Sequence, residues 1–97
     1  MTLDEFSDSL QEDAPPEPLD APLRALWEDA KGDWEAAHRL AQNDPSAAGA
    51  WVHAYLHRKE GDLANAAYWY SRAGRPQAQG PLKAEWADIV RALLTQS

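Results

Sequence analysis

The chain has 97 residues, of which 44% are hydrophobic, and it carries a formal net charge of −7 at pH 7. A chain of this size forms one domain and buries roughly 60% of the surface that its unfolded form exposes. It contains no cysteine, which excludes both a disulfide-stapled secreted scaffold and a thiolate nucleophile or metal ligand. The sequence shows neither a leader segment nor ~18 consecutive apolar residues, so we expect a cytoplasmic protein that does not enter a membrane.

The negative charge lies at one end of the chain. Residues 1–22 contain seven acidic and no basic residues, whereas residues 23–97 contain nine of each. Nucleic-acid binding depends on neutralising phosphate with basic side chains. The balance therefore disfavours nucleic acid as a partner, although the neutral part of the chain has room for a local basic patch.

The first predicted element is a short helix within residues 3–12. Thr2 and Glu5 have the spacing of a capping box, in which two orphan amides are satisfied reciprocally. Apolar residues recur on one helical face. They are Leu3, Phe6 and Leu10. Alone, so short a helix is marginal.

Four prolines follow between residues 14 and 22. They fix the backbone torsion φ and remove amide donors, which favours an extended linker. We therefore predict that residues 1–22 form an acidic, proline-rich flexible tail that carries the short amphipathic helix. Residues 23–97 are predicted to form a single all-α domain.

Five helices are predicted in this domain. Residues 23–30 have apolar positions at helical spacing, and Gly32 then permits a left-handed stop. Asp33 has the residue type of a helix cap, so the second helix covers about residues 34–43.

Asp44 and Pro45 predict the start of the third helix, because a capping carboxylate precedes the proline favoured at the first helical position. This helix extends to about residue 60, where Gly61 and Asp62 repeat the stop and start. The fourth helix ends near Ala73, before a loop over residues 74–80.

Pro81 opens the last predicted helix, which has the most regular apolar face in the chain. That face consists of Leu82, Trp86, Ile89, Val90 and Leu93. A final helix of this kind caps the apolar end of a short helical array.

The two Gly-Asp pairs are 29 residues apart, from 32 to 61, and such a period is typical of stacked helix-turn-helix units. The second unit resembles a tetratricopeptide repeat. Its Gly-Asp turn is followed by the small residue Ala66, the aromatic Tyr70 and the small residue Ala73. In the first unit Ala37 fits, but Ala41 stands where an aromatic is usual, and the period is shorter than the family's ~34.

The segments AKGDWEAAH and WVHAYLHRKEGDLANAAYWYSRAGR are also similar to a group of small bacterial proteins of unassigned function. Together these resemblances imply an all-α, tetratricopeptide-like stack of about five helices with a C-terminal capping helix. They carry over no catalytic residue and no ligand.

A candidate ligand or polar cluster begins with His53 and His57, one helical turn apart, and Glu60 three residues further on. Two histidines at this spacing are known from zinc sites, but a third firm ligand is needed and the HExxH motif is absent. On a helical wheel the pair lies opposite the apolar side that contains Trp51 and Tyr55. A solvated polar face, contact with a ligand or partner, and a metal site are all open readings.

His38 lies on the same predicted face as Trp34, Ala37 and Ala41. A histidine in such a position is typically a core or groove residue whose ring nitrogens bond to a neighbour. A three-histidine site would form if His38 met the histidine pair across the stacked helices. The spacing in the sequence does not supply that geometry, so we assign no metal.

Aromatic and basic residues concentrate between residues 51 and 75. In the tetratricopeptide frame, several of them line a concave surface suited to an acidic or carboxylate-ended peptide. The candidate binding residues are Trp51, Tyr55, Arg58, Lys59, Trp69, Arg72 and Arg75. The other interpretation is that the aromatics are helix-interface packing. The same frame also puts His53 and His57 at packing positions, in conflict with the wheel.

No phosphate-binding loop or nucleophile elbow is present, and we predict no catalytic residue and no cofactor. The leading hypothesis is a non-enzymatic interaction module that binds a protein or peptide partner, an acidic one, with a homodimer as an alternative. The rival hypothesis is a small ligand- or metal-binding protein, or an enzyme, that uses His38, His53 and His57. A corollary is that residues 3–12 dock at the arginines of the predicted surface, in the same chain or a second copy.

Overall fold

The computed structural model describes residues 1–95, and within that range it contains six α-helices, one 3-10 turn and no strand. The all-α class is confirmed. The final two residues of the predicted domain, 96 and 97, lie outside the described residues. The elements are α1 Leu3–Asp8, η1 Ser9–Gln11, α2 Ala21–Ala30, α3 Trp34–Gln42, α4 Ala47–Glu60, α5 Leu63–Ala73 and α6 Leu82–Leu94. None of these helices is long and apolar enough to cross a lipid bilayer.

Both Gly-Asp pairs form the predicted turns. Gly32 and Gly61 have φ angles of +93° and +90°, a conformation that costs glycine little because it has no Cβ. Asp33 and Asp62 then cap α3 and α5, each accepting a hydrogen bond from the backbone amide three residues further on. Each pair therefore ends one helix and begins the next.

The start of α4 differs from the prediction. Ser46 caps this helix by accepting a hydrogen bond from the Gly49 amide, and α4 begins at Ala47. The Asp44 carboxylate instead accepts from the Ser46 amide at 2.8 Å, in the turn before the helix. Two capping residues compete here, and the serine closer to the apolar run holds the helix end.

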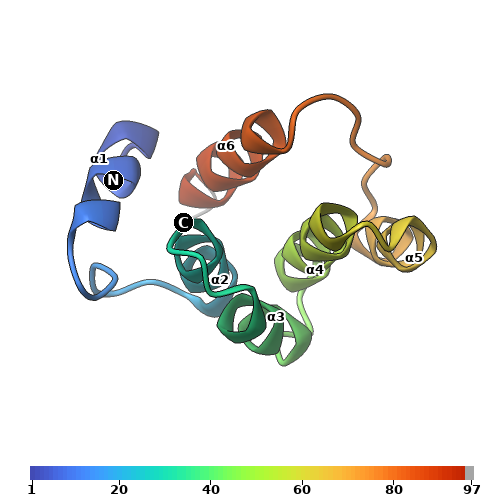
Figure 1. The fold of residues 1–97 in the computed structure, drawn as a ribbon, viewed down its shortest axis with the longest axis horizontal. Coiled ribbons are helices and arrows are strands. Elements are labelled where there is room, and N and C mark those ends of the chain that lie inside the picture. Colours follow the sequence, from blue (N-terminus) through green and yellow to red (C-terminus); the bar gives the residue numbers. More distant parts are fainter. Residues whose placement is uncertain (96–97) are drawn as a thin grey trace.

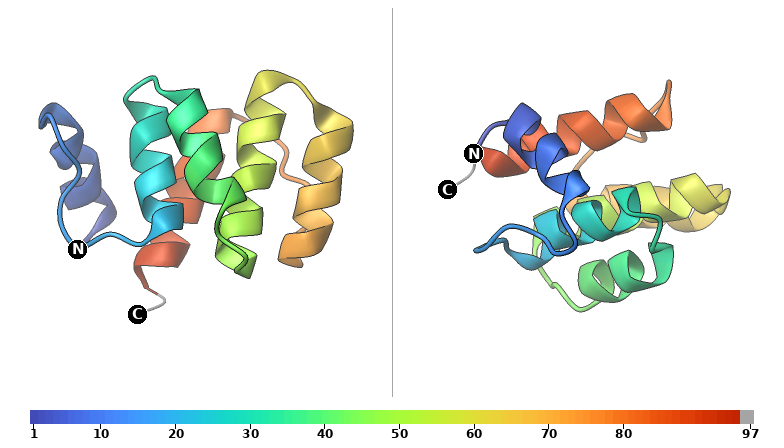
Figure 2. Two further views of the ribbon diagram at one scale, coloured as in Figure 1. Left: turned by 90° about the horizontal axis from the view of Figure 1, so that it is seen from below. Right: turned by 60° about the vertical axis from the view of Figure 1, so that its left-hand side comes forward.

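The helices from α2 to α5 stand side by side in chain order, and α6 lies behind α2 and α4 (Figure 2, left). Helix α3 contacts α2 and α4, and α5 contacts α4. Helix α6 packs on α2, α4 and α1, on the side of α2 and α4 away from α3 (Figure 1). The final helix therefore covers the flank of the array rather than capping its end after α5.

The main core lies between α2, α4 and α6. Helix α4 is buried on nearly every side, as expected for a helix enclosed by neighbours. The fully buried side chains include Leu26, Trp27, Val52, Leu56, Ile89 and Val90. Ala37 and Ala41 are also buried and permit close approach of α3.

Helix α1 forms with the predicted capping box. The Glu5 amide donates to the Thr2 hydroxyl at 3.1 Å, and the Thr2 amide donates to the Glu5 carboxylate at 2.9 Å. Phe6 has no exposed surface, and its ring centroid lies 5.8 Å from that of Trp86. Phe6 thus anchors the predicted helix on α6, while Leu3 and Leu10 of the same face are half-buried.

The segment before residue 23, predicted as a flexible tail whose docking the sequence left open, packs on the domain. Trp27 donates its indole N–H to the Ser9 hydroxyl at 3.1 Å, and the Lys31 ammonium donates to the carbonyls of Leu10 and Glu12. Helix α2 also begins at Ala21, inside the predicted tail. The docking site is therefore formed by α2 and α6, not by the arginines that the corollary proposed.

Candidate functional site

Three histidine side chains meet where α3 packs on α4. His38 comes from α3, and His53 and His57 come from α4. One ring nitrogen from each lies within 4.8 Å of the others, and Nε2 of His38 is 3.1 Å from Nε2 of His53. The juxtaposition that the sequence left open is present, and we call these residues the three-histidine cluster.

The packing of α3 explains this meeting. The small side chains of Ala37 and Ala41 bring α3 close to α4. The Trp34 indole N–H donates to the carbonyl of Leu56 at 2.9 Å, which ties the two helices together one turn before His38. Because His38 follows Trp34 by four residues, its side chain reaches the same interface.

Glu60 orients His57. Its carboxylate lies 2.7 Å from Nδ1 of His57, and in the neutral imidazole a donor at Nδ1 leaves Nε2 as the nitrogen with a free lone pair. A carboxylate behind the ring of a metal-binding histidine is a common supporting arrangement, since it fixes both the tautomer and the ring orientation. His57 is buried and Glu60 is exposed.

Two rings of the cluster, those of His53 and His38, favour the neutral form. Burial, followed by the proximity of His57 and then His38, lowers the pKa of His53 to about 4. Burial and the proximity of His57 also lower the pKa of His38, partly opposed by Glu60 and Glu35. Neutral imidazole is the form that coordinates metals, so these two rings are in the ligand state at pH 7.

Two tryptophans hold the cluster between them. The Trp34 ring stacks on His38 with centroids 4.9 Å apart, and the Trp69 ring of α5 stacks on His53 at 4.0 Å. Nδ1 of His53 is buried and has no hydrogen-bond partner among residues 1–95. A buried polar atom without a partner costs stability, and a ligand bound at Nε2 would leave that cost in place.

The separations suit a small metal ion. With zinc–nitrogen bonds of about 2.0–2.1 Å in a tetrahedral site, two ligand nitrogens lie about 3.4 Å apart. The Nε2 atoms of His38 and His53 are already near that separation, and a third nitrogen within 4.8 Å reaches it by movements on the order of 1 Å. His38 is half-buried, which leaves the cluster accessible at its α3 side.

The predicted aromatic-basic surface is split by the fold. Tyr55 and Lys59 both turn toward α2, where the phenol O–H and the ammonium each donate to the carboxylate of Asp29 at 2.9 Å. Arg58 turns toward α6, where it donates to Glu85 at 2.8 Å and to the carbonyl of Gly80. Tyr55, Lys59 and Arg58 therefore form hydrogen bonds within the fold.

The remaining predicted binding residues lie on α4, on α5 and in the loop that follows α5. The guanidinium carbon of Arg75 lies 3.8 Å from the ring centroid of Trp51, and that of Arg72 lies 5.6 Å from Trp69. The hydroxyl of exposed Tyr68 accepts a hydrogen bond from Arg72. Neither arginine has a carboxylate partner in the part of the chain that the structure describes.

Sequence reasoning missed the two buried carboxylates, Asp29 and Glu85. Asp29 is in the last turn of α2, where the helix dipole disfavours a negative charge. That unfavourable position was an available signal of a cationic partner. Glu85 is in the first turn of α6, where an acidic residue is ordinary, so its pairing with Arg58 had no signal.

Comparison of the chain with models of protein families, with curated proteins and with solved structures finds no match. The resemblance to tetratricopeptide repeats therefore stays a prediction.

Proposed function

We propose that this protein binds a divalent transition-metal ion, of which Zn²⁺ is the reference probe, at the three-histidine cluster. The observation that carries the proposal is the convergence of three imidazole nitrogens within 4.8 Å of one another. Support from outside the cluster comes from Glu60, which holds Nδ1 of His57 and turns the other nitrogen into a ligand.

The chemistry of the donors selects the class of ion. Imidazole nitrogen suits zinc, copper, nickel and iron, whereas calcium and magnesium prefer oxygen donors. Three protein ligands leave a fourth tetrahedral position for water or for a group from a partner. The proposal assigns ion binding to the cluster and no reaction.

The test is a zinc titration of the full chain, stripped of metal and free of any affinity tag, against a chromogenic chelator at pH 7.4. We expect one zinc per chain with a dissociation constant tighter than about 1 µM. His38→Ala and His57→Ala should each weaken binding at least tenfold, because removing one of three ligands leaves a pair.

Trp69→Phe is the matched control, since it keeps an aromatic ring over His53 but removes no nitrogen of the cluster. Circular dichroism verifies that every variant is folded. Zinc uptake that is substoichiometric, or equal in the wild type and the histidine variants, would refute the proposal.

The outer surface of α4 and α5 supports a second candidate function, the binding of an acidic peptide. Arg72 and Arg75 are exposed and lie on aromatic rings rather than on carboxylates, which leaves their donors available for charge-assisted bonds. Leu63 and Tyr68 of α5 are 64% and 53% exposed. Aromatic residues next to arginine are favoured at interfaces.

This candidate is tested with an array of peptides that end in acidic residues, each paired with an amidated neutral counterpart. We expect the acidic members to bind the wild type and to lose binding with Arg72→Ala and Arg75→Ala. Arg91→Ala, on α6, is the control. Equal binding of acidic and neutral peptides would exclude this candidate function. The alternative of a homodimer is tested separately by sedimentation.

A further inference from the structure

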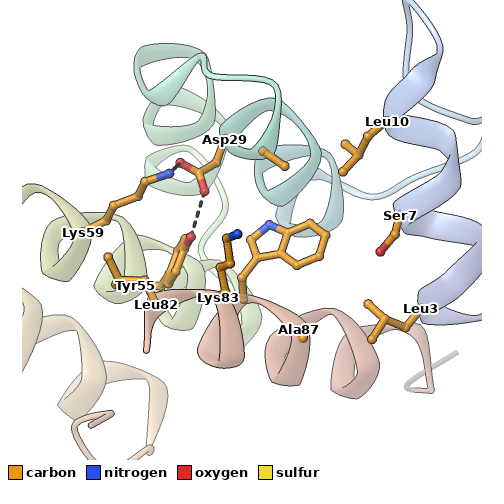
Figure 3. A pocket seen from close by; sticks show the side chains of 11 residues that line it. Leu3, Ser7, Leu10, Asp29, Tyr55, Lys59, Leu82, Lys83 and Ala87 are labelled. Carbon is orange, nitrogen blue, oxygen red and sulfur yellow. Dashed lines mark hydrogen bonds and ion pairs between the residues drawn. The ribbon is translucent and has the colours of Figure 1, made fainter. Parts of the chain in front are cut away.

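A cavity lies beside α4, apart from the three-histidine cluster. It has a volume of about 600 Å³ and lies between α1, α2, α4 and α6 (Figure 3). That volume is within the ~300–1,000 Å³ typical of small-molecule sites. The three-histidine cluster takes no part in it, because its histidines face α3 and α5.

One end of this cavity is apolar. Leu3 of α1 and Leu10 of η1 line one side of it, and Ala87 lines it from α6 (Figure 3). Trp86 of α6 also lines the cavity. The Trp86 indole N–H donates to the Leu26 carbonyl at 3.0 Å, which fixes the ring and satisfies its polar atom. An alkyl chain in this space would remove apolar surface from water, at about 25 cal/mol per Å².

The other end is charged. Asp29 is 3% exposed and binds the Lys59 ammonium at 2.9 Å, so these two charges offset each other. Lys83 also lines the cavity, is exposed and has no ion-pair partner within residues 1–95. The formal charge of this end is +1, from −1 for Asp29 and +1 for each lysine.

The two ends select a class of ligand. A positive head region next to an apolar chamber fits an amphiphile whose head is anionic, and lysine ammonium groups form charge-assisted hydrogen bonds with carboxylates. A cationic amphiphile would meet Lys59 and Lys83, because Asp29 is already paired. We infer that this cavity binds a hydrophobic carboxylate, such as a medium-chain fatty acid, with its carboxylate at Lys83 and Lys59 and its chain against Trp86 and α1.

The head group is tested first. Dodecanoate, dodecanol and dodecyltrimethylammonium are titrated into the full chain below their aggregation concentrations, and binding is followed by calorimetry. The expected order of affinity is dodecanoate, then dodecanol, then the cation. Equal affinity for the three would show nonspecific adsorption and overturn the inference.

The location is tested with substitutions in α6. Lys83→Ala should weaken dodecanoate binding about tenfold and leave dodecanol unchanged, and Lys83→Arg should restore binding. Arg91→Ala is the matched control, since Arg91 is on the same helix, outside the cavity, and pairs with Asp88. If Lys83→Ala binds dodecanoate as the wild type does, the site is not this cavity.

The apolar chamber is tested with Ala87→Phe, which fills the space that the chain would occupy. This variant should bind neither dodecanoate nor dodecanol, and wild-type affinity in a folded Ala87→Phe protein would also overturn the inference. His57→Ala should leave dodecanoate binding intact, so failure of the metal proposal and failure of this one are distinguishable. If Ala87→Phe fails to fold, the Lys83 series decides the outcome.

Discussion

Glu60 contacts the three-histidine cluster through one hydrogen bond. Substituting it distinguishes a role in positioning His57 from a general effect of negative charge. Glu60→Gln keeps the shape of the side chain but removes the carboxylate that holds Nδ1 of His57. We expect zinc affinity to fall about 10–100-fold. Glu35→Gln, which removes another negative charge near His38, should change affinity less than about threefold. Equal losses in the two variants would contradict a positioning role.

Two buried tyrosine phenols make the stability of the fold depend on pH in the alkaline range. Burial is the main cause that raises the pKa of both Tyr55 and Tyr70 above the usual value. The carboxylate of Asp29 raises the pKa of Tyr55 further, and that of Glu85 raises both. In the unfolded chain a phenol ionises near pH 10, so the unfolded state releases these protons first. The stability they contribute is complete below about pH 10 and is lost as the pH rises further.

Melting temperatures measured between pH 8 and 11 test this expectation. The wild type should lose stability above pH 10, and Tyr55→Phe should lose less over the same interval because one buried phenol is gone. Tyr68→Phe, at an exposed position, is the control. If the melting temperature falls equally with pH in the wild type and in Tyr55→Phe, ionisation of Tyr55 does not destabilise the fold.

At the scale of the element, Gly49 decides how α4 begins. A Cβ at this position would lie 2.5 Å from the Asp44 carbonyl oxygen. Gly49→Ala should therefore lower the free energy of unfolding by about 1–3 kcal/mol, measured by urea unfolding. Ordinary helix propensity predicts the opposite sign, a gain of about 1 kcal/mol, so a more stable variant would contradict the close approach.

The helix ends show what local sequence determines. The Gly-Asp pairs at residues 32 and 61 act through a left-handed glycine and a side-chain cap, both within four residues of the helix end, and both were predicted correctly. The start of α4 was wrong because Asp44 and Ser46 are both capping residues. Capping propensity does not decide which of the two begins the helix. The Asp44 carboxylate accepts a hydrogen bond from the Ser46 amide in the turn before α4, which leaves Ser46 as the cap.

The conflict over α4 also has a structural answer. The helical wheel put Tyr55 on the buried side and His53 on the solvated side, whereas the repeat frame placed His53 in packing. Tyr55 is 3% exposed and His53 is 4% exposed. Helix α4 contacts α2, α3, α5 and α6, so both residues are covered by neighbouring helices.

At the scale of the whole molecule, the N-terminal segment is part of the core. Phe6→Ala should lower the free energy of unfolding by about 3–5 kcal/mol, the usual loss for a buried phenylalanine. Leu63→Ala removes a similar apolar side chain at an exposed site and should change it by less than about 0.5 kcal/mol. If the wild type and Phe6→Ala are equally stable in urea, the N-terminal segment is a flexible tail and not part of the core.

Contacts between distant residues are what the sequence could not provide. Tyr55 and Lys59 meet Asp29 from 26 and 30 positions away, and Arg58 meets Glu85 from 27. Basic residues that look available in the sequence are therefore used internally. His38 meets His53 across 15 positions, and only the packing of α3 on α4 makes that pair a site.

Imidazole nitrogen resonances report on metal binding at the three-histidine cluster. Chain labelled with ¹⁵N is titrated with Zn²⁺ at pH 7.4 while the side-chain signals of His38, His53 and His57 are recorded. We expect that one ring nitrogen of each histidine shifts, that the three shift together and that the change is complete at one equivalent. Signals that stay in place, or that move separately and only with excess zinc, would contradict it.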